Sequence, residues 1–346
     1  MRYGLIADDL LEGAALATGV LPFPLLDVLL PLVQARALMC AAKLGIFSSV
    51  GSGSKTVEEL LRDCGTSRES TIGLLRVLEC AGYVRSRGGR YWLTARARKS
   101  MVPGSPSCLA GYVEFNYVQW DWIAGMEDVI RSGRGLDVHA RMRDPSSWWL
   151  YQRAMLETAA RMAPHVAPLV PIKHRARALL DVAGSHGMYG ALICRLHPPM
   201  RSVVLELPDA VASAASLAAQ AGIQDVVTHR AGNLRTDGWE AGWDAIFLGQ
   251  IAHHLDDADL RAVLDRSLHT LSADGTVAIW DIEARRQGDK PDLVADAMSL
   301  FFQLTSTSTC RSAADYATFL HDAGFHHIRV RRTKHAPGQV LVTARR

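Results

Sequence analysis

A glycine-containing turn followed by an acidic residue is the part of the sequence that points most clearly to chemistry. Residues 179–190 read LLDVAGSHGMYG, an apolar run that enters a turn at Gly184 and Gly187 and continues into a helical pattern. Glycines let the backbone of such a turn approach a ligand closely, because no side chain stands in the way. The next apolar run ends in Glu206, and a carboxylate at the tip of a second strand can accept hydrogen bonds from both ribose hydroxyls. Together these features predict a site for an adenosine-bearing ligand.

The elements that must position this site follow a regular order. From residue 178 onward, apolar runs alternate with helical patterns, which is typical of βαβ units around a parallel sheet. The predicted strands are 178–183, 202–206, 225–229, 243–249, 275–281, 326–332 and 339–344. The predicted helices lie near 188–197, 209–221, 257–271 and 312–323. The adenosine site would lie at the carboxyl ends of the central strands.

The first half of the chain has a different pattern. Apolar residues recur at helical spacing over 24–47, and two short capped helices are predicted at 56–61 and 67–80. Residues 83–94 have the pattern of a hairpin, so that the segment predicts a winged helix. Residues 108–170 show helical patterns rich in aromatic residues and methionine.

The composition of the chain indicates which classes of protein to expect. The chain of 346 residues is 49% hydrophobic and 21% charged, which predicts a packed protein with two domains or one large domain and an appendage. A formal net charge of +3 gives no strong reason to expect nucleic acid or an anionic membrane as a partner. Six widely spaced cysteines without a CxxC pair favour reduced thiols in the cytoplasm over a disulfide frame or a zinc site.

The apolar N-terminus predicts a subunit contact rather than a membrane segment. Pro22, Pro24, Asp27 and Pro31 interrupt the apolar stretch 14–33, and acidic residues precede it where a signal peptide carries positive charge. An apolar segment that is neither signal nor span is expected to pack on another surface. With the aromatic residues near 110–125, it predicts a homodimer.

Five further motifs occur in a fixed order. They are LELPD at 205–209, GNL at 232–234, WDAIFLGQIAHHLDD at 243–257, LSADG at 271–275 and AGF at 323–325. In this order and spacing the chain resembles the class I S-adenosylmethionine-dependent O-methyltransferases of the plant caffeate type and their bacterial small-molecule relatives. The resemblance covers nearly the whole sequence. It implies an α/β fold, with a Rossmann-like seven-stranded methyltransferase sheet and an N-terminal, mainly helical winged-helix dimerisation domain.

The resemblance also implies domain limits and residue roles. The dimerisation domain would cover 1–107, a helical linker that contributes to the dimer and the acceptor pocket 108–175, and the S-adenosylmethionine domain 176–346. His253 would be the general base, and Asp281 would orient it. The cofactor-binding residues would be Asp181, Gly184 and Gly187 at the methionine part, Glu206 at the ribose, Asn233 and Leu234 at the adenine, and in addition Leu207, Gly249 and Gln250.

The chain departs from the family pattern at several of these positions. Ala183, Ser185 and His186 interrupt a motif that is usually richer in glycine, and bulk there would crowd the methionine carboxylate. Cys310 takes the place of a second orienting acid. Asn233 stands where an acid would accept a hydrogen bond from the adenine amino group, which its amide oxygen can also do.

The implied chemistry is methyl transfer to a hydroxyl of an aromatic or polyketide-like acceptor. The hydroxyl must lose its proton as the methyl carbon approaches, and an imidazole, with an ordinary pKa of about 6.5, can take that proton at neutral pH. Trp149, Met155 and Met162, with Trp148 and Tyr151, are candidates to line the acceptor pocket, although a helix core would use the same residues.

The other histidines are given no catalytic role. His254 is expected to be exposed, and His326 and His327 are expected on the surface of the sixth strand, so no metal site is predicted.

Two alternatives remain open at this stage. The same fold can bind S-adenosylmethionine for carbon methylation or for chemistry without methyl transfer. The winged helix can instead bind DNA, with the second domain as a ligand sensor, through a basic wing. The basic residues are Arg85, Arg87, Arg90, Arg96, Arg98 and Lys99.

Overall fold

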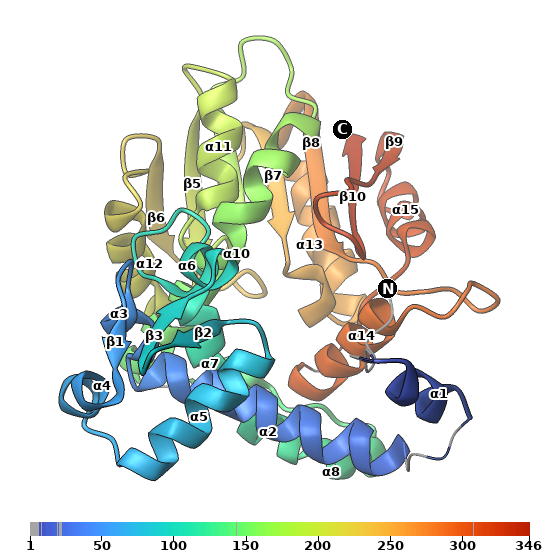
Figure 1. The fold of residues 1–346 in the computed structure, drawn as a ribbon. Helices are drawn as coiled ribbons and strands as arrows, with labels where there is room; N and C mark the ends of the chain where they lie inside the picture. Colours follow the sequence, from blue (N-terminus) through green and yellow to red (C-terminus); the bar gives the residue numbers. More distant parts are fainter. Residues whose placement is uncertain (1–6, 8, 19, 21–22, 143, 307) are drawn as a thin grey trace. The chain divides into compact units, whose positions relative to one another are not determined.

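The chain forms two compact units. The computed structural model describes residues 7, 9–18, 20, 23–142, 144–306 and 308–346 (Figure 1). The units are Met1–Tyr117 and Val118–Arg346, and their boundary lies within helix α7 (Ala110–Ala124). The division into a domain, a linker and a second domain at 107 and 175 stays a prediction.

The first unit combines helices with a small sheet. Its helices are α1 (Leu10–Thr18), α2 (Phe23–Lys43), α3 (Ile46–Val50), α4 (Val57–Cys64), α5 (Arg68–Cys80) and α6 (Ala95–Met101). Strands β1 (Lys55–Thr56), β2 (Val84–Arg87) and β3 (Arg90–Leu93) form an antiparallel sheet in the order β1-β3-β2. The predicted hairpin is thus confirmed, whereas β1 was not predicted. The name winged helix stays a prediction.

Local signals explain the helix starts in this unit. Thr56 and Glu59 form a reciprocal capping box at the start of α4, as expected from their spacing. Ser67 precedes α5 without a side-chain cap, and its carbonyl instead accepts a hydrogen bond from the Thr71 hydroxyl. The predicted helix over 24–47 ends at Lys43, because Gly45 takes a left-handed conformation before α3 begins. The core of the unit contains Leu60, Leu75, Leu78 and Leu93.

The second unit begins with helices and continues as a β/α domain. After α7 come α8 (Met126–Ser132), α9 (Val138–Arg141), α10 (Pro145–Val166) and the 3₁₀ turn η1 (Ala167–Leu169). The strands are β4 (Ala178–Val182), β5 (Arg201–Glu206), β6 (Val227–Ala231), β7 (Trp243–Gly249), β8 (Leu271–Ile282), β9 (His326–Arg331) and β10 (Gln339–Arg345). Between them lie α11 (Met188–Leu196), α12 (Pro208–Gln220), η2 (Ala252–His254), α13 (Asp257–Thr270), α14 (Leu293–Thr305) and α15 (Ala313–Asp322).

The seven strands form one sheet in the order β6-β5-β4-β7-β8-β10-β9, in which β10 runs antiparallel to both neighbours. All seven predicted strands and all four helices predicted after residue 176 are confirmed within a few residues, whereas α14 was not predicted. The fold class is therefore the predicted α/β class with a Rossmann-like seven-stranded sheet.

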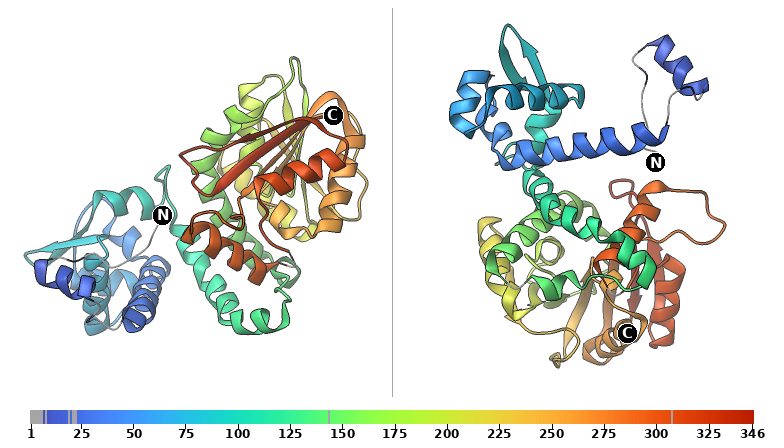
Figure 2. Two further views of the ribbon diagram at one scale, coloured as in Figure 1. Left: turned by 90° about the vertical axis from the view of Figure 1, so that its right-hand side faces the viewer. Right: turned by 90° about the horizontal axis from the view of Figure 1, so that it is seen from below.

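The sheet is buried on both faces (Figure 2). Successive residues of a strand point to opposite faces, so Leu180 and Ile246 belong to one core cluster and Leu179 and Phe247 to the other. A parallel sheet covered by helices on both sides is expected to have such continuous apolar strands. This packing leaves the carboxyl ends of the strands as the place where polar side chains gather.

None of the helices described in the structure is long and apolar enough to cross a membrane.

Candidate active site

A pocket lies at the carboxyl ends of β4, β5 and β7, within the second unit. It is lined by Asp137, His139, Trp148, Tyr151, Ala183, Ser185, Glu206, Leu207, Asn233, Leu234, Arg235, Gln250, Ile251, His254, Leu255 and Ser306. Five of the nine predicted cofactor residues therefore lie around one hollow, namely Glu206, Leu207, Asn233, Leu234 and Gln250.

The turn after β4 forms one wall of the pocket. Ala183 and Ser185 both have a φ of +52°, a left-handed conformation that is costly for residues with a Cβ atom. Gly184 cannot be replaced without a clash, because a Cβ atom there would lie 2.3 Å from the Asp181 carboxyl carbon. The strained backbone and the missing side chain at Gly184 keep this turn close against Asp181.

Two buried carboxyl groups lie beside the turn. The Glu206 carboxylate accepts hydrogen bonds from the backbone N–H groups of Ser185 (3.0 Å) and Leu207 (2.8 Å). Burial raises the pKa of Glu206 to about 7. Burial likewise raises the pKa of Asp181 to about 7, and its Oδ2 atom has no hydrogen-bond partner.

These groups fit S-adenosylmethionine. A carboxylate with two donors has acceptor capacity left for two ribose hydroxyls, so Glu206 suits the predicted role. The left-handed backbone and the close approach at Gly184 leave little side-chain bulk on this wall of the hollow. An unpartnered buried oxygen such as Asp181 Oδ2 is expected to gain a donor, directly or through water, when a polar ligand binds nearby.

Two histidines anchor the turn. The backbone N–H of Met188 donates to His186 Nδ1 at 3.0 Å, and His229 Nε2 lies 2.9 Å from the Ser185 carbonyl oxygen. His186 is buried and is not among the residues that line the pocket. Ala183 and Ser185 do line it, and the prediction that bulk on this turn crowds the methionine part of the cofactor stays a prediction.

The predicted base and its partner meet in a buried pair. His253 Nδ1 lies 2.5 Å from Asp281 Oδ1, and the backbone N–H of His253 donates to Oδ2 of the same carboxylate at 3.0 Å. The two side chains are 2% and 0% exposed. The His253 ring also lies against Phe302, with 3.7 Å between the ring centroids. Contacts on both sides thus hold the imidazole in one orientation.

His254 differs from its prediction. It is half-buried and lines the pocket, because the 3₁₀ turn η2 directs it toward the hollow. Its ring packs edge-on against His139 at a centroid distance of 4.5 Å, and His139 Nε2 lies 3.2 Å from the Tyr151 hydroxyl. Burial lowers the pKa of His139 to about 4 and places the pKa of His254 well below its ordinary value. Both imidazoles are therefore neutral at physiological pH.

The predicted acceptor residues fall in different places. Trp148 and Tyr151 line the pocket, whereas Trp149, Met155 and Met162 are not among its lining residues. Met162 packs instead against the core cluster on one face of the sheet. His139 was missed, and no local signal marks it, because its role depends on where α9 packs.

Of the other predicted residues, Asn233 lines the pocket, whereas Gly249 and Cys310 are not among its lining residues. Gly249 ends β7, and a Cβ atom there would lie 2.5 Å from the Phe247 ring, so glycine is needed for packing. The Asn233 side-chain oxygen accepts a hydrogen bond from the Arg235 N–H at 2.9 Å. Cys310 is buried, and burial together with the charge of Asp281 raises the pKa of its thiol to about 12.

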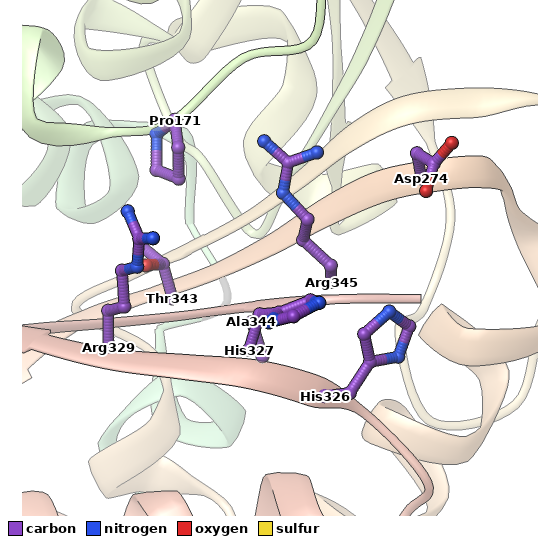
Figure 3. A pocket seen from close by; sticks show the side chains of 8 residues that line it. All are labelled: Pro171, Asp274, His326, His327, Arg329, Thr343, Ala344 and Arg345. Atoms are coloured by element: carbon purple, nitrogen blue, oxygen red, sulfur yellow. The ribbon is translucent and has the colours of Figure 1, made fainter.

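A second hollow lies near the other end of the strands (Figure 3). Its lining residues are Pro171, Asp274, His326, His327, Arg329, Thr343, Ala344 and Arg345. His326 and His327 are exposed on β9, as predicted. Across the described part of the chain, no group of three or more His, Cys, Asp or Glu side chains could hold a metal ion.

Comparisons with known proteins agree with this geometry. Residues 121–326, more than half of the chain, match the family model of the O-methyltransferase domain. The chain is similar to 3-hydroxy-5-methyl-1-naphthoate 3-O-methyltransferase of Streptomyces sahachiroi, with 27% identity over 90% of this chain and 91% of the relative. It is also similar to demethylspheroidene O-methyltransferase of Cereibacter sphaeroides, with 26% identity over 88% and 82% of the two chains.

Among solved structures, human N-acetylserotonin methyltransferase in complex with S-adenosylmethionine shares the fold. The TM-score is 0.81 at 17% identity, and the match covers 99% of each chain. The family match, the shared fold and the pocket at the strand ends lead to one conclusion: this chain belongs to the S-adenosylmethionine-dependent O-methyltransferase family.

Proposed function

We propose that the protein transfers a methyl group from S-adenosylmethionine to a phenolic hydroxyl of an aromatic or polyketide-like small molecule, with His253 as the general base. The observation that carries this proposal is the buried pair of His253 and Asp281 at 2.5 Å, whose imidazole contacts His254 in the lining of a pocket that also contains the Glu206 carboxylate. The Streptomyces relative, which by its name methylates a hydroxyl of a naphthoate, supports a bicyclic aromatic acceptor.

The residues of the strand ends would bind the cofactor. Glu206 would accept from the ribose hydroxyls, while Asn233, Leu234 and Gln250 would surround the adenine. The bound cofactor supplies an electrophilic methyl group on a sulfonium. Asp181, with its unpartnered oxygen, would lie toward the methionine part together with Gly184 and Gly187.

His253, paired with Asp281, would take the proton from the acceptor hydroxyl. Asp281 accepts from Nδ1–H, which fixes the tautomer and leaves Nε2 as the proton acceptor. When Nε2 takes the hydroxyl proton, the adjacent carboxylate stabilises the resulting imidazolium. Such general-base help is worth roughly 10²–10⁴-fold, and positioning of the donor and acceptor adds to it.

The aromatic side of the pocket would select the acceptor. Trp148, Tyr151 and the neutral imidazoles of His139 and His254 offer flat surfaces and a few polar atoms without a fixed charge. This surface suits a planar ring that carries a hydroxyl. Trp149, Met155 and Met162 remain proposed acceptor residues.

The test is a transfer assay with labelled S-adenosylmethionine and a panel of phenols, hydroxynaphthoates and matched carbon nucleophiles. We expect a mass gain of one methylene on oxygen, located by NMR of the product. Methylation on carbon alone would contradict the proposed reaction. Cofactor binding in calorimetry without transfer to any acceptor would favour chemistry without methyl transfer.

We also propose a homodimer in a reducing, cytoplasmic compartment. Helix α2 has a run of half-exposed apolar side chains, namely Val28, Leu29, Leu30, Leu32 and Val33. Such a surface favours contact with a second copy. The six cysteines lie outside any disulfide in the structure. Small-angle scattering should give the mass of a dimer, and removal of the first 30 residues should yield monomers or aggregates; an unchanged dimer after truncation would contradict the role of this segment.

The structure offers little support for DNA binding. Three of the basic residues near the hairpin have partners within the first unit, since Arg90 bonds to Ser54, Arg98 bonds to the Leu93 carbonyl and Arg96 lies over Tyr83. A salt-sensitive shift of short DNA duplexes in a gel would nevertheless revive that alternative.

A further inference from the structure

The carboxylate of Asp281 has a full set of hydrogen-bond donors. Its Oδ1 atom accepts from His253 Nδ1 at 2.5 Å and from the Ile282 N–H at 2.7 Å. Its Oδ2 atom accepts from the His253 N–H at 3.0 Å and from the Tyr316 hydroxyl at 3.2 Å. A carboxylate offers about four acceptor sites, so all of them are used in a side chain that is 0% exposed.

Tyr316 is the only one of these donors that comes from a side chain other than the base itself. It lies in α15 and is fully buried in the core cluster that covers one face of the sheet. Burial and the nearby charge of Asp281 raise the pKa of its hydroxyl well above the ordinary value. The hydroxyl therefore keeps its proton and can only donate to the carboxylate.

The surroundings leave this donor role to Tyr316. Cys310, the residue at the place of the second acid, carries a neutral thiol and has no hydrogen bond to His253 or Asp281 among those described. The Arg311 guanidinium donates hydrogen bonds to the Ala252 and Leu255 carbonyl oxygens and to the Asp257 carboxylate. The His253 ring contacts the neutral imidazole of His254, which in turn contacts His139, and the Arg235 guanidinium donates to the His254 carbonyl at 3.3 Å.

We propose that Tyr316 is a positioning residue for methyl transfer, which orients Asp281 and limits how strongly Asp281 holds the charged form of His253. A donor on a carboxylate disperses its negative charge, so the hydroxyl weakens the pull of Asp281 on the imidazole proton. It also fixes the plane of the carboxylate and thereby the direction of the base. Tyr316 would thus do part of the orienting work that the resemblance assigns to a second acid. The inference rests on the proposed function.

The test compares Tyr316→Phe with Asp281→Asn in the full-length enzyme. Tyr316→Phe should lower kcat about ten-fold while the calorimetric Kd for S-adenosylhomocysteine stays unchanged. The acid limb of its kcat–pH profile should move up by about half to one pH unit, because the freed carboxylate stabilises the protonated base more strongly. Asp281→Asn should move the acid limb to lower pH, because it removes the charge that stabilises the protonated base. Tyr83→Phe, which alters a tyrosine of the first unit, is the matched control and should change neither quantity.

A purely structural tyrosine would behave differently. If Tyr316→Phe lowers only the melting temperature, with kcat and the acid limb unchanged, the proposal is overturned. 3-Fluorotyrosine at position 316 keeps the ring and strengthens the donor, so it tests the proposal even if the phenylalanine variant does not fold. It should shift the acid limb to lower pH, and no shift would also overturn the proposal.

A spectroscopic measurement separates this inference from the proposed reaction. The short hydrogen bond between His253 and Asp281 predicts a far-downfield proton resonance for Nδ1–H, which Asp281→Asn should abolish. Replacement at Tyr316 should shift that resonance whether or not an acceptor is known. An unchanged resonance would contradict the role of Tyr316, whereas failure to methylate any acceptor would contradict only the proposed function.

Discussion

The two carboxylates at the ends of β5 and β8 are both buried, yet they differ in how well their oxygens are satisfied. Asp281 accepts four hydrogen bonds from its own protein, whereas Glu206 accepts two, both from backbone N–H groups. Burial with few donors raises the pKa of Glu206 to about 7. In the proposed roles, the Asp281 carboxylate beside the base is preformed, whereas Glu206 keeps acceptor capacity for a ligand with hydroxyl donors.

We propose that this difference reflects a different task of each group. A residue that fixes a tautomer must hold one geometry through the whole reaction, so intramolecular donors serve it best. A residue that binds a ligand must keep acceptor sites free, at a cost in stability of the free protein. The five predictions below test this contrast in order of decreasing effect.

Replacement of the base should give the largest effect. His253→Gln removes the proton acceptor and should lower kcat by roughly 10²–10⁴-fold, while binding of S-adenosylmethionine remains. Single-turnover rates and calorimetry on the same sample would measure the two quantities. His269→Gln, at an exposed histidine of α13, is the control. Equal losses in both quantities would mean that His253 serves the cofactor pocket rather than the chemistry.

Glu206→Gln should affect binding more than turnover. The amide keeps one acceptor oxygen but loses the charge, so the affinity for S-adenosylmethionine should fall about 10- to 100-fold, the range for hydrogen bonds to a charged group. At saturating cofactor, kcat should change little. Isothermal titration would give the affinity, with the surface variant Glu69→Gln as reference. An unaltered Kd would remove Glu206 from the proposed ribose site.

The stability of the ligand-free protein should depend on pH through its two buried carboxyl groups. The pKa values of Glu206 and Asp181 are raised to about 7 from ordinary values of 4.5 and 3.8. Between about pH 4 and pH 7 these two groups hold more protons in the folded protein than in the unfolded chain, so their contribution to stability falls as the pH rises. The half-buried histidines His139 and His254, whose pKa values are lowered, contribute in the opposite sense. The contribution of Glu206 is therefore the difference between the melting curves of the unaltered protein and of Glu206→Gln, and this difference should change with pH in the stated direction.

The affinity for S-adenosylmethionine should increase as the pH rises, whereas the contribution of Glu206 and Asp181 to stability decreases. The ribose hydroxyls need the ionised carboxylate as acceptor, so binding should strengthen as the pH rises toward 7. Titrations at pH 5.5 and 7.5 would separate the two effects, and a pH-independent affinity would argue against an ionised Glu206 in the complex.

The glycine turn should give the smallest effect. Ala183→Gly removes the cost of a Cβ atom at a φ of +52°, partly offset by the freedom that glycine gains in the unfolded chain. We expect a gain of about 1 kcal/mol or less in the free energy of unfolding, from denaturant titration. Gly184→Ala is the opposite case and should destabilise the turn, because its Cβ atom would meet the Asp181 carboxylate. Destabilisation by Ala183→Gly would mean that the methyl group contributes packing.

Much of this protein could be predicted from its sequence, for physical reasons that are local. Strand positions follow from continuous apolar runs, and Glu206 was found because it ends such a run. His253 and Asp281 were found through motif order, and the structure brings these two residues together in one hydrogen bond. In each case the signal lies within a few residues of the position predicted.

The remainder depended on tertiary structure. His254 was expected to be exposed, but the turn η2 directs it into the pocket beside His139, a residue from a helix far away in the chain. Tyr316 reaches Asp281 across 35 residues of sequence, and no local pattern distinguishes it from an ordinary core tyrosine. The sequence by itself determined where the strands of the sheet lie and which motifs follow them, because backbone periodicity is a local property. Only the packed fold decided which donors surround each buried carboxylate, because hydrogen-bond partners are set by distance in space.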